Sequence, residues 1–491
     1  EFYYVGVSGD TLIDGVSTWN LHDSIIYNGN TWEKLANTNV PVATLEASTI
    51  NEYTVYVKSD VAPAATQTGS ALYPYRDIQT AVDAAAAGSS ILLNGTFTVT
   101  SPITAAVGKT LYFYSAGEGA TVQYGSYDQA NTEIFTLSCI TPVHGATFSF
   151  DGITFKNAGT YALDINNATN ILVKRCFFEN NGWDGTGLSL QEAASGSTLG
   201  YDSAQSALSA AFNTNGSEGG AIRVNTGLKV ELTDNEIKEG NEGVLIIDAG
   251  FAQGLAEGSV VVSRNQIFNN LGIGVNLESR ATTLSSASPG YNGVRNAVVY
   301  NNAINYNGDN GIRVRGGREN TLSLNVVKSN WCAGIDLKSA SNTRVRDLDV
   351  TDNNKSNFNA DGTAAEGLAS IIIQGTYIQP EASFITEILN VQVLNTDDSS
   401  TVSRNGIEIT EEVGTIDSAG TIISFDNIGF LNQDFSITNR ANLSNINLSI
   451  GDCKFINSNE TNIRNTADSG SDDYYELPFS NHTTTINPVD E

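Results

Sequence analysis

The feature that most constrains this chain is a short repeat marked by Asn and Gly. In each copy an aliphatic residue follows Asn by two positions. The copies are Asn235-Glu-Ile237, Asn265-Gln-Ile267, Asn302-Ala-Ile304 and Asn325-Val-Val327. In the last three, Gly follows the Asn by nine residues and opens a stretch of alternating apolar residues. The Asn positions are 30, 37 and 23 residues apart, so a unit of roughly 23 residues carries insertions.

The alternation within each unit predicts short strands, because apolar residues recur at every second position in pieces of three to five residues. Three such strands in one unit fit a coil of a parallel β-helix, an all-β solenoid. Asn tolerates left-handed backbone geometry and can hydrogen-bond to the next coil, so we expect the four Asn residues to form an inward-facing ladder. Cys176 and Cys453 fall at the same coil position and are expected to be small buried fillers.

A solenoid end needs a cap, and the residues before the first coils supply one. Residues 53–57 read as a strand, and residues 77–87 read as a helix closed by Gly88. We expect the apolar stripe of this helix to cover the first coil. The stripe consists of Ile78, Ala81, Val82 and Ala85.

Two stretches carry resemblances to known families. Tyr73-Pro-Tyr-Arg-Asp-Ile-Gln-Thr-Ala-Val82, followed by Gly88-Ser-Ser-Ile-Leu-Leu-Asn-Gly-Thr96, resembles the start of the pectate-lyase-like superfamily as it occurs in phage tail spikes. Leu12-Ile-Asp-Gly15, Trp19, Asp23, Tyr27-Asn-Gly29 and Trp32-Glu-Lys34 resemble a small module common in tailed-phage tail fibre and structural proteins. The resemblances imply a right-handed parallel β-helix with a capping helix, an attachment module, and a location on the virion or otherwise outside the cell.

These observations predict four regions. Residues 1–35 form a β module with hairpin-type turns, one of them at Asn28-Gly29, and residues 36–52 form a linker. The β-helix with its cap spans 53–465 and carries insertions at 182–219, 281–296 and 354–368. Residues 466–491 form a C-terminal segment that caps the last coil or joins neighbouring subunits, and the spike resemblance implies a homotrimer.

Composition excludes several classes of function. The chain has 25 Lys and Arg against 54 Asp and Glu, a net charge of −29, so it repels nucleic acid and anionic lipid. No apolar run approaches the ~18 residues of a membrane span. Four Cys without a CxxC pair and three scattered His predict neither a zinc site nor a catalytic triad. We expect no metal or other cofactor, since no compact acidic cluster calls for calcium.

The candidate site is a strip of outward-facing polar residues, one from each coil. Arg223, Asn276, Arg313 and Asp336 should stack along the axis, with Glu278, Arg315 and Lys338 two positions along. At a spacing of ~4.8 Å opposite charges would pair, so the strip can be a purely structural ion-pair ladder. The other interpretation makes it the floor of a glycan groove. Insertions 182–219 and 354–368 leave the coil at the same turn and would flank it.

The groove interpretation assigns roles to nine residues. The candidate catalytic acids are Asp336, Glu278 and Glu218, because glycosidases use paired carboxylates. The candidate hydrogen-bond donors to substrate are Arg313, Arg223 and Asn276, and the candidate stacking rings are Trp183, Tyr201 and Phe358.

Three functions remain open. The first is a virion fibre or spike protein that binds a host-surface polysaccharide or lipopolysaccharide and contacts other tail proteins through its N-terminal module. The second is a polysaccharide depolymerase, a hydrolase or lyase, working on the same face. The third is a purely structural virion or collar component. Binding without cleavage is favoured, because a basic neighbour beside each candidate acid should keep its pKa too low for proton donation.

Overall fold

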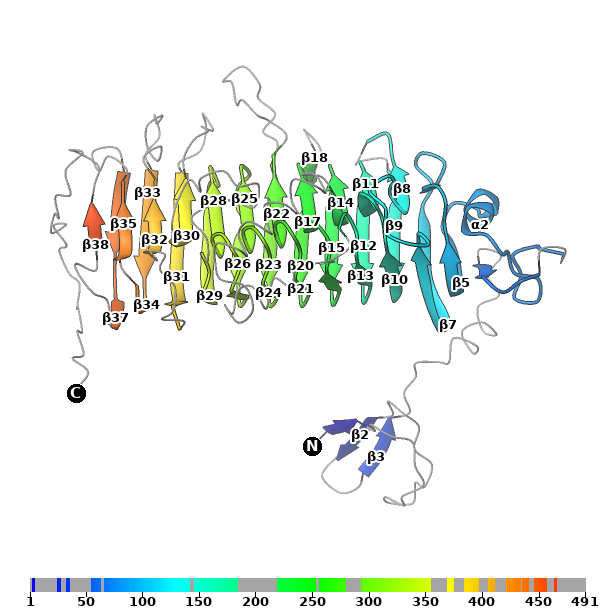
Figure 1. Cartoon of the computed structure of the whole chain (residues 1–491), viewed down its shortest axis with the longest axis horizontal. Helices are drawn as coiled ribbons and strands as arrows, with labels where there is room; N and C mark the ends of the chain where they lie inside the picture. The colour runs from blue at the N-terminus through cyan, green and yellow to red at the C-terminus, as the bar shows by residue number, and fades with distance from the viewer. Residues whose placement is uncertain are drawn as a thin grey trace.

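The computed structural model describes most of the predicted solenoid (Figure 1). The described residues are 2–4, 24–27, 32–35, 54–62, 66–141, 145–183, 219–252, 256–279, 293–354, 369–374, 384–396, 405–410, 421–433, 435–440, 446–456 and 463–465. Within these ranges no helix is long and apolar enough to cross a membrane.

Successive coils stack through parallel strand pairing on three sides, which confirms the predicted right-handed parallel β-helix. Two sides belong to one 21-stranded sheet of the described residues, which bends at a corner of each coil. Its strands are β4 Thr54–Lys58, β5 Ser89–Thr98, β7 Leu111–Gln123, β9 Thr147–Asp151, β10 Ile153–Lys156, β12 Asn170–Lys174, β13 Phe177–Glu179, β15 Lys229–Thr233, β16 Glu236–Lys238, β20 Ser259–Ser263, β21 Gln266–Phe268, β23 Ala297–Tyr300, β24 Ala303–Asn305, β26 Thr321–Ser323, β27 Val326–Lys328, β29 Thr343–Thr351, β31 Phe384–Leu394, β33 Thr421–Asp426, β34 Ile428–Leu431, β36 Ile446–Ile450 and β37 Cys453–Ile456.

The third side is a twelve-stranded parallel sheet in the described ranges, and it is the side that carries the predicted strip. Its strands are β6 Ile103–Thr104, β8 Phe135–Ser138, β11 Tyr161–Asn166, β14 Gly220–Asn225, β17 Glu242–Ile247, β22 Val275–Glu278, β25 Ile312–Arg315, β28 Ile335–Lys338, β30 Ala369–Gln374, β32 Asn405–Ile409, β35 Phe435–Asn439 and β38 Ile463–Asn465. A small antiparallel pair, β18 Phe251–Ala252 and β19 Ala256–Glu257, projects after β17.

The predicted Asn ladder is present and faces inward. The Nδ2 groups of Asn235, Asn265 and Asn302 each donate to the Oδ1 of the next Asn in the series, at 2.9, 3.0 and 2.9 Å. Each Oδ1 also accepts the backbone N–H of the preceding ladder residue, and all four side chains are buried. Cys176 opens the ladder by donating its N–H to Asn235, and both it and Cys453 are buried as expected.

Left-handed backbone geometry lies one residue before the ladder, not on the Asn residues themselves. The residues with positive φ at this corner are Gly152, Arg175, Asp234, Arg264, Asn301, Leu324, Asp347, Asn390 and Asn427. For Arg or Leu such a conformation costs on the order of 1–3 kcal/mol. The pairing of the coils on both sides of the corner holds it in place.

A second buried ladder follows the next corner and was not predicted. Asn270, Asn307 and Asn330 donate their Nδ2 groups to Asn307, Asn330 and Asn353 at 3.0, 2.9 and 2.8 Å. Each member lies five residues after the matching member of the first ladder or its equivalent, so the spacing was visible in the sequence.

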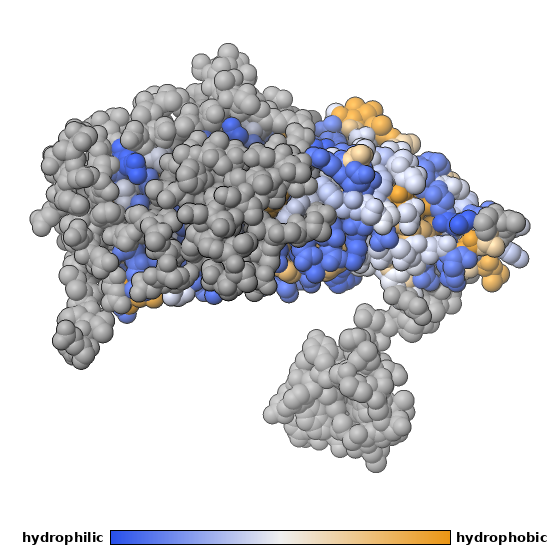
Figure 2. Space-filling model, in the orientation of Figure 1, coloured by the Kyte–Doolittle hydropathy of each residue, from blue (hydrophilic) through white to orange (hydrophobic). Residues whose placement is uncertain are grey.

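The core is filled by inward-facing aliphatic residues, with aromatic packing near the N-terminal end. Phe113 and Phe150 stack with ring centroids 4.9 Å apart, and Phe135 packs edge-on against both. Outside, the described atoms visible in Figure 2 are mostly hydrophilic, with smaller apolar patches.

The capping helix is present but shorter than predicted. Helix α2 spans Ile78–Ala84, with Asp77 as N-cap accepting the Thr80 N–H at 2.8 Å. Ala85 is buried but has extended backbone angles, because the chain must already turn toward β5. The stripe predicted to cover the first coil is buried, and α2 packs against β4, β5 and β6.

The N-terminal residues contribute β1 Phe2–Tyr4, β2 Ser24–Tyr27 and β3 Trp32–Leu35 in one antiparallel sheet. Strands β2 and β3 pair antiparallel, with Tyr27 opposite Trp32, and the predicted turn at Asn28-Gly29 lies outside the described residues. The interiors of the three predicted insertions and the C-terminal segment 466–491 lie outside the described residues.

Substituting Asn302 with Ala should destabilise the solenoid by about 2–3 kcal/mol, because the Asn265 N–H loses its acceptor in a buried site. The matched control is Asn305→Ala, since the Oδ1 of Asn305 has no hydrogen-bond partner. The control should cost about 1 kcal/mol or less. Free energies of unfolding from guanidinium titrations compare the two, and equal losses would contradict the ladder's role.

Candidate functional site

The predicted strip forms on the outer face of the twelve-stranded sheet. Strand register aligns Arg223 with Leu245, Leu245 with Asn276, Asn276 with Arg313, and Arg313 with Asp336. The four predicted members therefore share one row, interrupted by an apolar residue that sequence reasoning did not place there. Arg315 and Lys338 pair in the next row, and the Arg315 guanidinium lies 3.1 Å from Glu278.

At the N-terminal end of the strip, Arg223 is held by a bidentate contact. Its Nε and one of its terminal nitrogens each donate to Asp164 at 2.9 Å, and Glu133 lies 3.6 Å away. The guanidinium also lies over the Tyr161 ring, 4.7 Å from its centroid. The hydrogen bonds that Arg223 donates to Asp164 raise the pKa of Arg223, so its charge is fixed.

The centre of the site is Glu242, which the sequence analysis did not identify. The Tyr161 hydroxyl donates to one carboxylate oxygen at 2.6 Å, and Asn276 Nδ2 donates to the other at 3.0 Å. Only 9% of Glu242 is exposed. Burial raises the pKa of this carboxyl above its usual value, although the hydrogen bonds from Tyr161 and Asn276 act in the opposite direction. Burial and the adjacent Glu242 also raise the pKa of Tyr161 well above its usual value.

A glycine makes the contact between Tyr161 and Glu242 sterically possible. Register places Gly220 directly between the two residues, on the intervening coil. A Cβ atom at this position would lie 2.1 Å from the Glu242 carbonyl oxygen. Without a side chain there, the tyrosine hydroxyl reaches across one coil to the carboxylate.

A second carboxylate, Glu278, lies beside the first. Asn276 Nδ2 also donates to Glu278 at 3.2 Å, so one amide joins the two carboxylates. Since both bonds share that nitrogen, the two bonded oxygens are at most about 6 Å apart, near the separations that glycosidases use. Arg315 and Arg313 approach Glu278 to 3.1 and 3.6 Å, which confirms the expected basic neighbours for this acid.

The other predicted residues are placed differently. Asp336 is buried and accepts a hydrogen bond from Gln374 at 3.1 Å. Trp183 is only 2% exposed, so its ring is packed into the structure and offers no stacking face, which corrects the prediction for this residue. Glu218, Tyr201 and Phe358 lie outside the described residues.

Within the described part of the chain, no group of three or more His, Cys, Asp or Glu side chains is arranged to hold a metal ion. The carboxylates of the site instead face guanidinium, amide and phenol groups.

Comparison with known proteins supports the fold. The model of the right handed beta helix region matches residues 136–288 and 207–366. No curated protein matches the chain. Among solved structures, the A-module of Azotobacter vinelandii mannuronan C-5 epimerase AlgE4 is 12% identical, with 87% of this chain and all of that one covered, at a TM-score of 0.42.

Two further solved structures are similar at the same level. Pectate lyase Pel9A is 13% identical, with 79% of this chain and 78% of that one covered, at a TM-score of 0.33. The catalytic domain of a GH87 α-1,3-glucanase is 11% identical, with 89% of this chain and 69% of that one covered, at a TM-score of 0.37.

The pKa of Glu242 predicts how stability depends on pH. The folded protein holds the carboxyl proton of Glu242 more tightly than the unfolded chain does. The stabilisation that this gives is therefore greatest below pH 4.5, the pKa of the carboxyl in the unfolded chain. It is lost as the pH rises through the pKa of Glu242 in the folded protein. Glu242→Gln removes the titration and keeps neutral hydrogen-bonding groups beside Tyr161 and Asn276. The free energy of unfolding of the variant relative to the parent should therefore be higher at pH 8 than at pH 5, as measured by urea titrations.

The control for this measurement is Glu319→Gln, which neutralises an exposed carboxylate. It should leave the parent's pH dependence unchanged. A Glu242→Gln variant whose stability follows the parent in parallel between the two pH values would show that the carboxyl does not titrate with a raised pKa.

Proposed function

We propose that this chain is a virion fibre or spike protein that binds a cell-surface glycan along the outer face of its twelve-stranded sheet. The observation that carries the proposal is the ordered polar network on that face, in which the buried Asp164, Glu242 and Asn276 hold the partly exposed Arg223 and Arg313. Donors and acceptors held on a rigid sheet lose little conformational entropy when they bind sugar hydroxyls.

The length of the strip suits an oligosaccharide. Insertions 182–219 and 354–368 follow Asn181 and Asn353, which occupy the same corner of their coils. Between them lie strands β14, β17, β22, β25 and β28 of the sheet. At ~4.8 Å per coil these strands span on the order of 20 Å, room for roughly four sugar rings.

Charge favours a neutral glycan over an acidic one. The arginines of the strip already face carboxylates: Arg223 faces Asp164, and Arg313 and Arg315 face Glu278. An acidic polymer would have to displace these partners and approach a chain of net charge −29. A neutral polymer can exchange hydrogen bonds with the same groups at lower cost.

The virion location and the trimer rest on the resemblances of residues 1–35 and of the solenoid start. A homotrimer would present three glycan sites, and three weak sites on one particle gain avidity. The alternative of a purely structural component remains consistent with the ion pairs of the strip, which contribute only ~0–1 kcal/mol each where they are exposed.

Arg313→Ala should weaken binding to the preferred polysaccharide by about tenfold or more, because Arg313 combines a charge with a hydrogen bond to Asn276. The preferred polysaccharide is first identified on an array of immobilised neutral and acidic bacterial surface polysaccharides. Lys238→Ala is the matched control, since Lys238 is ion-paired and similarly exposed but lies on the 21-stranded sheet. Parent-like binding by both Arg313→Ala and a deletion of residues 190–212 would remove this face as the glycan site.

A second candidate function is cleavage of the bound glycan, and the carboxylate pair favours it. A raised pKa lets Glu242 hold a proton for the glycosidic oxygen, while Glu278 can act as nucleophile or base. Glu242 was not among the predicted acids, and its pKa is raised because burial outweighs its hydrogen bonds. Asp336 and Glu218 stay candidates, and Glu218 lies outside the described residues.

If the chain is a glycosidase, Glu242→Gln and Glu278→Gln should each lower release of reducing ends by about 100-fold or more, with polysaccharide binding retained. The measurement uses the polysaccharide that the parent binds best, and Glu319→Gln serves as control. Absence of any release by the parent would leave binding as the function of this face.

A further inference from the structure

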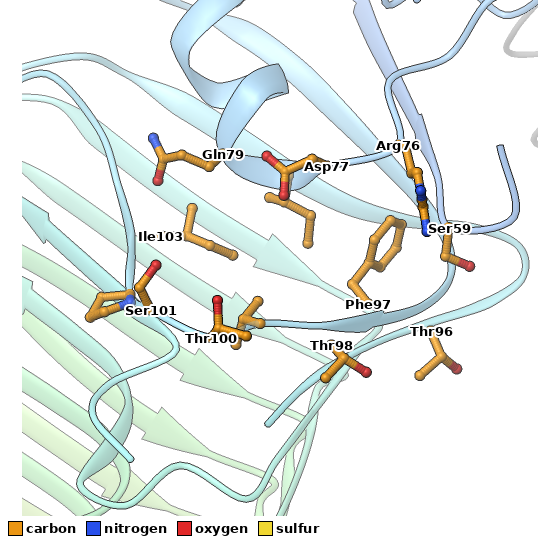
Figure 3. Close-up of a pocket in the computed structure, with 13 residues that line it drawn as sticks. Ser59, Arg76, Asp77, Gln79, Thr96, Phe97, Thr98, Thr100, Ser101 and Ile103 are labelled. Carbon is orange, nitrogen blue, oxygen red and sulfur yellow. The ribbon is translucent and has the colours of Figure 1, made fainter. Parts of the chain in front are cut away.

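A cavity of about 500 Å³ lies at the N-terminal end of the solenoid, before the coils that carry the proposed glycan-binding strip. One wall is formed by Arg76, Asp77 and Gln79 at the start of the capping helix. Figure 3 shows these residues facing the end of β5 across the cavity, where Thr96 and Thr98 lie. Nothing in the proposed glycan site uses this region.

The cavity occupies the place of a missing strand. Strand β4 pairs with Ser90–Asn94, the first half of β5, and its last register pair is Lys58 with Asn94. The second half of β5, Gly95–Thr98, pairs with β7 on one side. On its other side no strand of the described residues pairs with it.

The direction of the free backbone groups follows from one hydrogen bond. Val99 donates its N–H to Gln123 on the β7 side at 2.8 Å. In a parallel ladder successive residues point their N–H and C=O groups to opposite sides. The backbone N–H and C=O groups of Thr96 and Thr98 therefore face the cavity, and those of Phe97 face β7.

This edge lacks the devices that usually block strand addition. Its residues carry no charge and include no proline, and Thr96 and Thr98 are exposed β-branched residues. Phe97 is only 6% exposed, so no aromatic face is available to stack on a sugar ring. The available chemistry is that of a backbone edge about five residues long, which fits an extended peptide.

The charged residues that line the cavity are one basic residue, Arg76, and one acidic residue, Asp77. The Arg76 side chain is exposed, and no ion pair to it is found in the described ranges. Asp77 is occupied by the helix cap, where one oxygen accepts from both the N–H and the hydroxyl of Thr80. A peptide carrying a carboxylate near its end would complement Arg76.

From these features we propose that the free edge of β5 binds an extended segment of a partner protein, with one carboxylate near its end, as an added strand. The segment would hydrogen-bond to Thr96 and Thr98 and place a carboxylate at Arg76. This site is separate from the proposed glycan-binding face, and the proposal does not depend on that face.

The test uses the full-length chain and a fluorescein-labelled peptide that alternates valine and threonine and ends in aspartate. Thr98→Pro removes the N–H that faces the cavity, at an edge position where proline is tolerated. It should weaken peptide binding, measured by fluorescence polarisation, by about tenfold or more. Thr98→Val keeps the N–H and should bind as the parent does, whereas Arg76→Glu should bind weakly. Thermal unfolding confirms that each variant is folded.

Hydrogen exchange resolved to single residues gives a second readout. The amides of Thr96 and Thr98 should exchange fast in the free protein and slowly with the peptide, while Phe97 is slow in both. No saturable binding by the parent, or equal binding by Thr98→Pro, would overturn the proposal. A dimer of the parent that Thr98→Pro abolishes, without peptide binding, would overturn it in favour of a second copy of this chain.

Discussion

The whole architecture depends on one constraint, that the strands of each coil form their backbone hydrogen bonds with the neighbouring coils. The backbone pairs in parallel on all three sides, and the buried Asn side chains repeat the same connection inside the corners. A buried amide without its partner costs about 1–3 kcal/mol. A coil is therefore stable only when another lies on it, and the first one needs the helix α2 as a substitute.

Much of this was predictable because the constraint repeats along the chain. The 23-residue spacing of Asn302 and Asn325 indicated the coil, and the offset of the following Gly placed the outward row correctly. Arg313, Asn276 and Asp336 share that row because a period-2 strand fixes which side chains point outward. The helix boundary was less predictable, since Ala85 fits both a helix and the turn that follows it.

The centre of the candidate site was not predictable, because it depends on a contact between residues 81 positions apart. In the sequence Glu242 precedes Gly-Val-Leu-Ile-Ile, which reads as an ordinary buried strand. Its environment is set by Tyr161 from two coils earlier and by the absence of a side chain at Gly220 between them. No local pattern records that combination. The raised pKa follows from burial, which only the stacked coils create.

The corners give the molecule a further property. The left-handed residues at positions such as Arg264 and Leu324 complete each turn locally, and the strands of each coil pair only with strands of the neighbouring coils. A unit can then be duplicated or lost without disturbing the register of the others, and a loop at a corner can grow without reaching the core. Over evolutionary time, the gain or loss of coils can lengthen or shorten the outer face, while the chemistry of any one coil is kept.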